Sequence, residues 1–350
     1  MIETVGASTL AAIAGLFGGI LLGLSARLGR FCTLGAIEDL YYGGSDQRMR
    51  MWAIAIGVAI FGVYFLVAIG ALDPIETPYL SQSFNPLAAV LGGALFGYGM
   101  ALAGSCGYGA LARLGGGDLR YFVVVLVLGV SSYVTLSGPL AYVRVWAFPA
   151  TEAGSAQGIA HLVSDLSGLS VASVGLVIGG AILVAALSGK SIRSEPKVIL
   201  WGVLVGVAVV SGFWATYWIA TESFGEIGVE SHTFSAPPGE TILWLMTASG
   251  SSLSLGIGSV AGVLLGSFAG SLVKGHFRWE ACEDPRELKR QILGAILMGI
   301  GAVTALGCTI GQGVSAFAVL AYSAPLTLTA IVGGAALGLK QLITGFAPEI

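Results

Sequence analysis

Three of the four cysteines in this sequence lie in one repeated pattern. When Cys32, Cys106 and Cys308 are superimposed, the residues around them follow the pattern G-x4-G-x8-C-x2-G. The three copies read GGILLGLSARLGRFCTLG, GGALFGYGMALAGSCGYG and GAILMGIGAVTALGCTIG. Self-similarity of this kind indicates a structural unit that is used more than once. It would place the three thiols at equivalent positions in the fold.

A thiol favours a particular class of ligand. It is a weak hydrogen-bond donor and a soft, polarizable acceptor, so it matches soft sulfur atoms better than hard oxygen ligands. Thiolates also bind soft metals such as Cu(I), which keeps metal transport open as an alternative. No Met-rich or His-rich cluster accompanies the cysteines, however, and Arg27 and Arg30 precede the first of them. Together with Arg113, which follows the second, these cations favour an anion as the ligand.

Each copy also predicts backbone groups beside its cysteine. Glycine occurs three residues after each one, at Gly35, Gly109 and Gly311. Since glycine permits a left-handed or otherwise strained backbone, a helix would end here in a tight turn that exposes N–H groups. Exposed N–H groups of this kind bind anions. We therefore expect a binding site that combines the three thiols with Arg30 and with N–H groups near Ser105 and Gly107.

The composition predicts that membrane helices position these groups. Of 350 residues, 55% are hydrophobic and 10% are charged, and the mean hydropathy is +0.88. A soluble domain has about a quarter charged residues. Because a bilayer offers the backbone no water, long apolar runs must be helices. The 54 glycines, including Gly18 and Gly23 of the first copy, suit close packing between such helices. We predict a single all-α domain, 1–350, that is a polytopic integral membrane bundle.

About 20 apolar residues are needed to cross a bilayer. On this basis the predicted membrane segments are 8–28, 51–72, 86–105, 121–143, 169–188, 198–220, 241–273, 291–307 and 325–342. The segment 241–273 is too long for one helix and is interrupted by TASGSSLSLG. It is predicted to form a short helix followed by a longer one.

Charge in the loops predicts the orientation. Lys and Arg are concentrated in loops near residues 48–50, 113–120, 190–197 and 274–290, whereas the alternate loops are acidic. The positive-inside rule places the basic loops in the cytoplasm, the N-terminus outside and the C-terminus inside. The second and third cysteine copies then run in opposite directions. We therefore expect inverted repeats with interrupted or re-entrant helices, in related halves of about 1–190 and 191–350, and a site near the membrane midplane.

Several function classes lack support in the sequence. The net charge of −3 comes without a basic tail, so nucleic-acid binding is not expected. There is no Cys-x2-Cys pair for zinc or redox chemistry and no G-x4-GK[ST] loop for ATP, so neither a metal site nor a cofactor is expected. Cys282 lies in the charged segment EACEDPRELKR, outside the repeat, and is interpreted as incidental. The acidic loop 221–240 has no interpretation from sequence.

The motifs GRFCTLGAIED, GSCGYGALARLGGGDLR and GCTIGQGVSAF resemble the signatures of the YeeE/YedE family of bacterial membrane proteins, and the resemblance spans nearly the whole chain. It implies a bacterial cytoplasmic (inner) membrane protein that takes up thiosulfate or a similar sulfur-containing inorganic anion. It also implies an hourglass-shaped helical fold with loops entering from both faces. The cysteines at positions 32, 106 and 308 would pass the anion along by S–H···S hydrogen bonds. A small cytoplasmic sulfur carrier of the TusA/YeeD type would be a partner.

Other functions remain possible at this point. A cysteine could attack sulfane sulfur and hold it as a persulfide, which would make the chain a membrane sulfurtransferase. The chain could also act as a subunit that only positions a sulfur carrier. Some members of the family that it resembles are linked to selenium compounds instead. The sequence favours a transporter over an enzyme, without excluding these alternatives.

Overall fold

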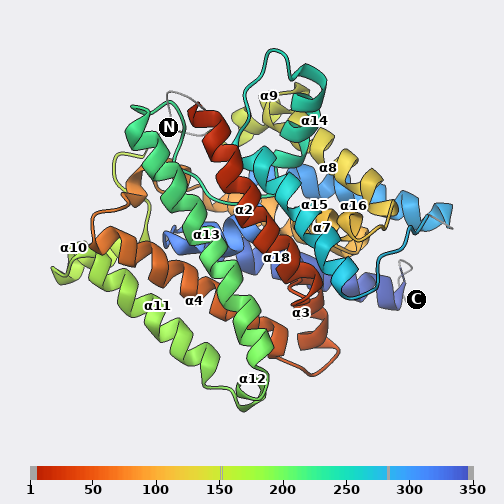
Figure 1. Ribbon diagram of the computed structural model, residues 1–350, viewed down its shortest axis with the longest axis horizontal. Helices are drawn as coiled ribbons and strands as arrows, with labels where there is room; N and C mark the ends of the chain where they lie inside the picture. The colour runs from red at the N-terminus through yellow and green to blue at the C-terminus, as the bar shows by residue number, and fades with distance from the viewer. Residues whose placement is uncertain (1–5, 150, 152, 282–283, 346–350) are drawn as a thin grey trace.

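The structure is a computed structural model that describes residues 6–149, 151, 153–281 and 284–345. Within these residues all regular elements are helical (Figure 1). Cys282 falls outside the described residues. The predicted all-α membrane bundle is confirmed: six described helices are long and apolar enough to cross a membrane, or up to eight if each of two bent helix pairs is one span.

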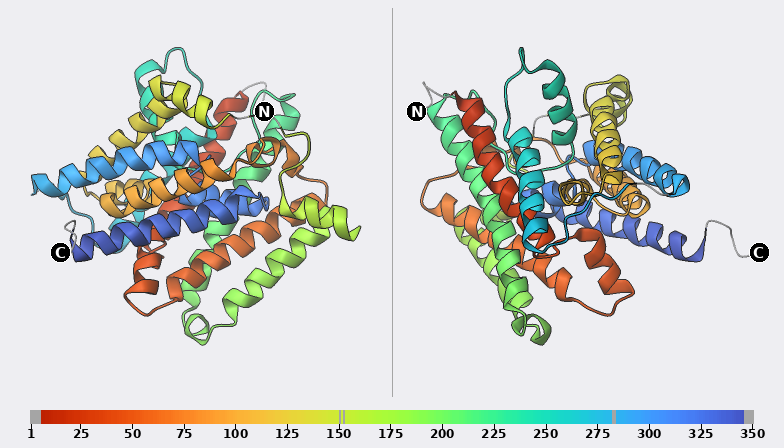
Figure 2. Two further views of the ribbon diagram at one scale, coloured as in Figure 1. Left: turned by 180° about the vertical axis from the view of Figure 1, so that it is seen from behind. Right: turned by 45° about the vertical axis from the view of Figure 1, so that its right-hand side comes forward.

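The long helices form two groups. The first group is α2 (Ala7–Arg27), α4 (Gln47–Ala68), α11 (Val171–Leu187), α13 (Pro196–Glu222) and α15 (Leu255–Val273). The second group is α6 (Pro86–Ala103), α8 (Arg120–Leu136), α16 (Pro285–Thr304) and α18 (Ser323–Thr344). In the left view of Figure 2, α6 lies between α16 and α18.

Short helices join the two groups. The ones that follow the cysteines are α3 (Thr33–Tyr41), α7 (Gly107–Gly115) and the pair η2 (Gly311–Ser315) and α17 (Ala316–Ala318). Each contacts both groups: α3 touches α4 and α18, α7 touches α15 and α8, and η2 touches α13 and α18. The remaining elements are η1 (Pro74–Glu76), α5 (Pro78–Ser81), α9 (Pro139–Ala147), α10 (Ile159–Ser167), α12 (Lys190–Arg193) and α14 (Pro237–Thr247). The cysteine turns therefore lie where the groups meet.

Glycine faces hold the long helices together, as the composition predicts. A Cβ at Gly92 would lie 2.7 Å from Ala305 N, and one at Gly99 would lie 2.6 Å from Gly294 O. This pairing shows that α6 and α16 pack backbone to backbone and run in opposite directions. The second and third cysteine copies are therefore antiparallel, as predicted from the loop charges. Small residues permit this close approach where lipid removes the hydrophobic drive between helices.

The predicted spans match the helices except where proline or glycine intervenes. The predicted break in 241–273 is present, with α14 and α15 on either side. The span predicted at 121–143 is not one straight helix, because α8 ends before Pro139 and α9 turns away by 58°. Proline cannot continue the α8 hydrogen-bond ladder. The span predicted at 169–188 matches α11, and α10 precedes it at an angle of 118°, with the left-handed Gly168 (φ 72°) between them.

The backbone break in each copy occurs before the cysteine and not after it. Two residues ahead of the cysteines, Arg30, Gly104 and Leu306 adopt left-handed backbones with φ of 56°, 74° and 57°. The long helix ends there, and the cysteine caps a new short helix. The expectation of a left-handed glycine three residues after the cysteine was wrong, because Gly35, Gly109 and Gly311 are helical. Their role is described below.

The loop 221–240 enters the protein. After α13, residues 228–236 form a segment without helix or strand, which we name the extended segment, and most of its side chains are buried, with His232 and Phe234 fully so. Thr216 anchors this extended segment, because its hydroxyl donates to Glu230 O (2.7 Å) and accepts from Glu230 N (3.1 Å). The segment leads directly to the third cysteine.

Candidate functional site

The three cysteines share one local geometry. Each thiol sulfur accepts a hydrogen bond from the N–H of the glycine three residues on, in the first turn of its short helix. The N···S distances are 3.5 Å for Cys32, 3.4 Å for Cys106 and 3.5 Å for Cys308. This is the arrangement of a helix N-cap with sulfur in place of the usual oxygen. Because the sulfur accepts this bond, its own S–H hydrogen is left to donate to a ligand.

The glycines of the repeat allow this cap to form in a crowded site. A Cβ at Gly109 would meet Ser105 Oγ, one at Gly35 would meet the Arg48 guanidinium, and one at Gly311 would lie 2.6 Å from Thr233 Oγ1. In each case a polar side chain occupies the space that a larger residue would need. The glycines therefore admit polar groups beside each thiol.

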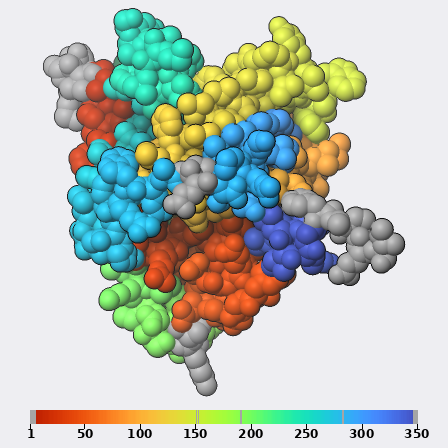
Figure 3. Space-filling view, turned by 90° about the vertical axis from the view of Figure 1, so that its right-hand side faces the viewer, coloured from red at the N-terminus to blue at the C-terminus, as the bar shows by residue number. Residues whose placement is uncertain are grey.

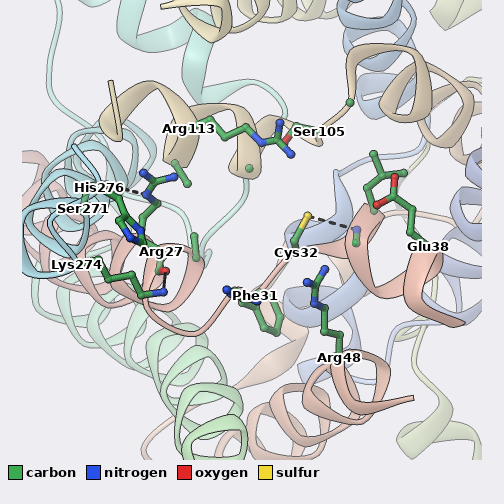
Figure 4. Close-up of a pocket in the computed structure, with 17 residues that line it drawn as sticks. Arg27, Phe31, Cys32, Glu38, Arg48, Ser105, Arg113, Ser271, Lys274 and His276 are labelled. Carbon is green, nitrogen blue, oxygen red and sulfur yellow. Dashed lines mark hydrogen bonds between the residues drawn. The ribbon is translucent and has the colours of Figure 1, made fainter. Parts of the chain in front are cut away.

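Cys32 opens onto a cavity of about 570 Å³ (Figure 4). Its thiol points into the middle of the view, with Arg113 on one side and Arg48 on the other. Of the expected site residues, Arg30, Cys32, Gly35, Ser105 and Gly109 line this cavity. Figure 3 shows the surface where residues 270–280 (light blue) approach α3 and α4 (orange-red). These three segments supply much of the cavity lining.

The cavity is strongly basic. Its lining includes the cations Arg27, Arg30, Arg48, Arg113 and Lys274, and Glu38 is the one carboxylate among the described lining residues. Partial desolvation, and then the charges of Arg30 and Arg27, lower the pKa of Lys274. The cations thus lie close enough to repel one another. An anion bound in this cavity would relieve the repulsion between the cations. We name this cavity the basic cavity.

Specific contacts hold the cations in place. Arg27 Nε donates to Ser271 Oγ (2.7 Å), and Lys274 Nζ donates to Arg27 O (2.6 Å), which fastens the ends of α2 and α15 together. Arg113 Nη1 donates to the Tyr121 hydroxyl (2.6 Å), and its guanidinium lies 4.9 Å from the centre of that ring. These residues are positioned before any ligand arrives, which lowers the cost of ordering them on binding.

Cys106 and Cys308 lie deeper and are fully buried. The Cys308 sulfur also accepts a hydrogen bond from Phe234 N (3.2 Å) and lies 3.8 Å from Thr233 Oγ1, both in the extended segment. Cys106 lies near the other two thiols, and the Thr309 hydroxyl lies within hydrogen-bonding reach of its sulfur. The Thr309 hydroxyl is buried and has no other hydrogen-bond partner among the described residues. A buried group of this kind is available to a ligand.

Aromatic rings belong to the same buried cluster as the deep thiols. Phe31 stacks on Trp52 with ring centres 4.5 Å apart, and Tyr108 lies 6.4 Å from Phe31 and 5.5 Å from Phe234. Gly107, expected to supply an N–H group, begins α7 here, and a Cβ on it would lie 2.7 Å from Phe234 O. The rings exclude water around the thiols, which strengthens any hydrogen bond made to them.

A second cavity of about 300 Å³ lies on the other side of the thiols, and we name it the far cavity. The basic cavity is built at the end of α6, whereas the far cavity is built at the end of α16. Since these helices are antiparallel, the two cavities lie at opposite ends of the α6–α16 pair. Gly307, next to Cys308, and Thr233, in contact with it, line the far cavity. The buried thiols therefore lie between two cavities.

Sequence reasoning missed part of this site. Arg48 was interpreted as a topology determinant, yet it lines the basic cavity and pairs with Asp39 (3.0 Å). The extended segment and Thr309 were not expected at all. The only signal for Thr309 was its place directly after a repeat cysteine. Among the described residues, no group of three or more His, Cys, Asp and Glu side chains could hold a metal ion.

Arg30 offers a clean test of the basic cavity, because it is exposed and its side chain makes no hydrogen bond or ion pair with the described residues. Arg30→Gln is expected to weaken the binding of a divalent anion about threefold to fivefold at low salt, with a smaller effect at high salt. The measurement is calorimetric titration of the detergent-solubilised protein. Arg278→Gln, which removes an exposed cation that does not line the cavity, should leave affinity unchanged. Equal losses in both variants would contradict a local role.

The chain is similar in sequence to known transporters. A family described as sulphur transport matches residues 28–337. The thiosulfate transporter TsuA of Escherichia coli strain K12 is 28% identical over 346 residues, covering 92% of this chain and 92% of the relative. TsuA of Spirochaeta thermophila is 27% identical over 308 residues, covering 85% and 89%. The probable transporter YedE of Escherichia coli strain K12 is 31% identical over 108 residues, covering 31% and 25%.

Proposed function

This chain belongs to the sulphur transport (YeeE/YedE) family, and we propose that it takes up thiosulfate, or a similar sulfur-containing anion, into the cytoplasm. Two relatives that it matches over most of its length are named thiosulfate transporters. The observation that carries the proposal is the set of three equivalent sulfur caps between two cavities at opposite ends of the α6–α16 pair. Thiosulfate joins a soft terminal sulfur to a hard, charged oxyanion end, and the site offers partners for both.

The proposed mechanism uses hydrogen bonds without covalent change. The thiol hydrogens of Cys32, Cys106 and Cys308 would donate to the terminal sulfur of thiosulfate in turn. The N-terminal N–H groups of α7, near Ser105 and Gly107, would hold its oxygens, since helix N-termini favour anions. A weak S–H donor suits transport, because each cysteine must bind the anion and then release it. Arg30 and the other cations of the basic cavity would receive the anion at one end.

The orientation follows from the charges. The basic cavity would face the cytoplasm, because the positive-inside rule places Lys and Arg on that side. The N-terminus would then be outside, the C-terminus inside, and the far cavity would open to the periplasm of a bacterial inner membrane. A TusA/YeeD-like sulfur carrier is a partner proposed for the cytoplasmic mouth. Such a carrier would remove thiosulfate as it leaves.

Uptake into proteoliposomes that contain only this chain tests the function. Radiolabelled thiosulfate is expected to enter in a saturable manner, and a tenfold excess of sulfate is expected to compete weakly, because sulfate lacks the soft sulfur that the thiols prefer. Equal competition by sulfate would contradict selection by the thiols. No uptake by folded protein would refute autonomous transport and favour a subunit that requires its carrier.

The sulfurtransferase alternative makes a different prediction. An enzyme of that kind would retain a persulfide on one cysteine after exposure to thiosulfate, whereas transport by hydrogen bonding requires none. Intact-protein mass spectrometry after incubation with thiosulfate and removal of free ligand distinguishes the two. Persistent addition of one sulfur atom to a repeat cysteine would favour the enzyme.

A further inference from the structure

One carboxylate lies in the far cavity, on the path proposed for an anion. Glu230 lines this cavity from the extended segment, and none of the described lining residues is Lys, Arg or His. Its side chain is half-buried and makes no hydrogen bond or ion pair with the described residues. A charged carboxylate in this place would repel a dianion, and with no cation in the lining nothing would offset that repulsion. The basic cavity, by contrast, has five cations.

The backbone links Glu230 to the third thiol. Glu230 is fixed at both its N–H and its C=O by Thr216 of α13. Three and four residues further on, Thr233 and Phe234 contact the Cys308 sulfur. The carboxylate is thus held at the entrance to the deep thiols by the same extended segment that packs against them.

The groups that face Glu230 do not neutralise it. The charged residue that acts on Glu230 is Glu240, in the first turn of α14, and it carries the same negative charge. Tyr79 of α5 also lines the cavity. His232 points away toward Ser259 of α15 (2.8 Å), and burial lowers its pKa to about 4, so it stays neutral. Burial, and then the charge of Glu240, raise the pKa of Glu230 to about 7. Its carboxyl group therefore takes up a proton near neutral pH.

We propose that Glu230 is a proton-binding site of the transport path, and that its protonation admits the anion to the far cavity. This inference rests on the proposed function. The neutral carboxyl group no longer repels the anion and can donate one hydrogen bond to it. No covalent bond changes; a proton from the outer solution joins the carboxylate before the anion enters. Above the pKa of Glu230 the carboxylate closes the cavity to anions.

Uptake measured at equal pH on both sides of the vesicle tests this proposal. Wild-type thiosulfate uptake is expected to fall about tenfold between pH 6 and pH 8, as the protonated fraction of a group with pKa about 7 falls from about 0.9 to about 0.1. Glu230→Gln keeps the size and a hydrogen-bond donor without the charge. Its uptake should vary less than about twofold over this range and should exceed that of the wild type at pH 8.

Glu240→Gln is the matched control, because it removes the neighbouring charge and leaves Glu230 in place. This variant should keep the decline, with its midpoint at lower pH, since the charge of Glu240 raises the pKa of Glu230. An unchanged decline in Glu230→Gln overturns the inference and leaves the transporter intact. Absence of uptake in the wild type at every pH overturns the proposed function itself.

A second measurement covers the case in which Glu230→Gln does not fold. Thiosulfate binding to the wild-type protein at pH 8, titrated in two buffers of different ionisation enthalpy, reports the protons taken up with the ligand. About one proton per thiosulfate is expected, because the carboxylate must be neutralised for binding. Binding without proton uptake would overturn the inference.

Discussion

Thiosulfate uptake by Cys106→Ala is expected to fall about tenfold or more, with a loss of stability of about 1 kcal/mol because the cap of α7 is removed. The side chain is small, fully buried and lies between the two cavities, close to both other thiols. Alanine removes the thiol that would donate to the terminal sulfur of thiosulfate at position 106. A hydrogen bond lost in a water-free site costs about 1–3 kcal/mol. The measurement is the initial rate in proteoliposomes, with thermal unfolding as the check on folding.

Two further variants make this result specific. Cys106→Ser keeps a donor but replaces a soft atom by a hard one, so it should transport thiosulfate poorly and be inhibited more strongly by sulfate. Cys282→Ala, which lies outside the repeat, should behave as the wild type. Full activity of Cys106→Ala would remove this thiol from the path. A similar loss in Cys282→Ala would point to a general effect of cysteine replacement.

The second large effect is expected at a helix contact and concerns stability. Gly262→Ala should destabilise the protein by about 3 kcal/mol, because its new Cβ would meet Leu16 O and would lie 2.8 Å from Gly19 Cα. These are backbone atoms of α2, which cannot move aside without separating α2 from α15. The packing of α2 on α15 also positions Arg27 and Lys274 at the ends of these helices. Thiosulfate uptake should therefore fall together with stability.

Gly333→Ala is the control for this prediction. Gly333 lies on α18, and a Cβ there would have no atom within 4 Å. Alanine is favoured over glycine in a helix by about 0.5–1 kcal/mol, so this variant should be as stable as the wild type or slightly more. Thermal unfolding in detergent measures both variants. If the two glycines responded alike, close packing of α2 on α15 would not explain the glycine content.

The repeat shows which structural features could be predicted from local sequence and which could not. The period of the glycines and cysteines predicted three equivalent units, and the loop charges predicted that two of them are antiparallel. The contact of Gly92 with Ala305 confirms the latter. The exact turn was not predictable in the same way. Arg30 and Leu306 occupy the left-handed position that glycine takes at position 104, so residue type alone did not mark it. Backbone hydrogen bonds of the next residues, from Phe31 N to Ser25 O (3.1 Å) and from Gly307 N to Ala302 O (2.8 Å), close the two turns.

Residues that act through distant contacts escaped prediction for a related reason. Glu230 and Thr233 lie in an acidic loop whose composition is that of a solvated connection. Only the packing of residues 228–236 against η2 and α15 brings this loop into the interior. Thr309 likewise becomes a candidate site residue only through tertiary packing, because the short helices bring the three thiols together beside it. None of these contacts joins residues near one another in sequence.

The sequence alone determined the membrane bundle, the approximate helices and the three thiols, because hydropathy and periodic spacing are properties of neighbouring residues. The tertiary structure decided which side chains share a cavity. It separated five cations from one carboxylate on opposite sides of the thiols, and it placed the extended segment beside Cys308. Burial and electrostatic environment depend on segments that meet only after the chain has folded, which is why the charge of the path could be read only from the structure.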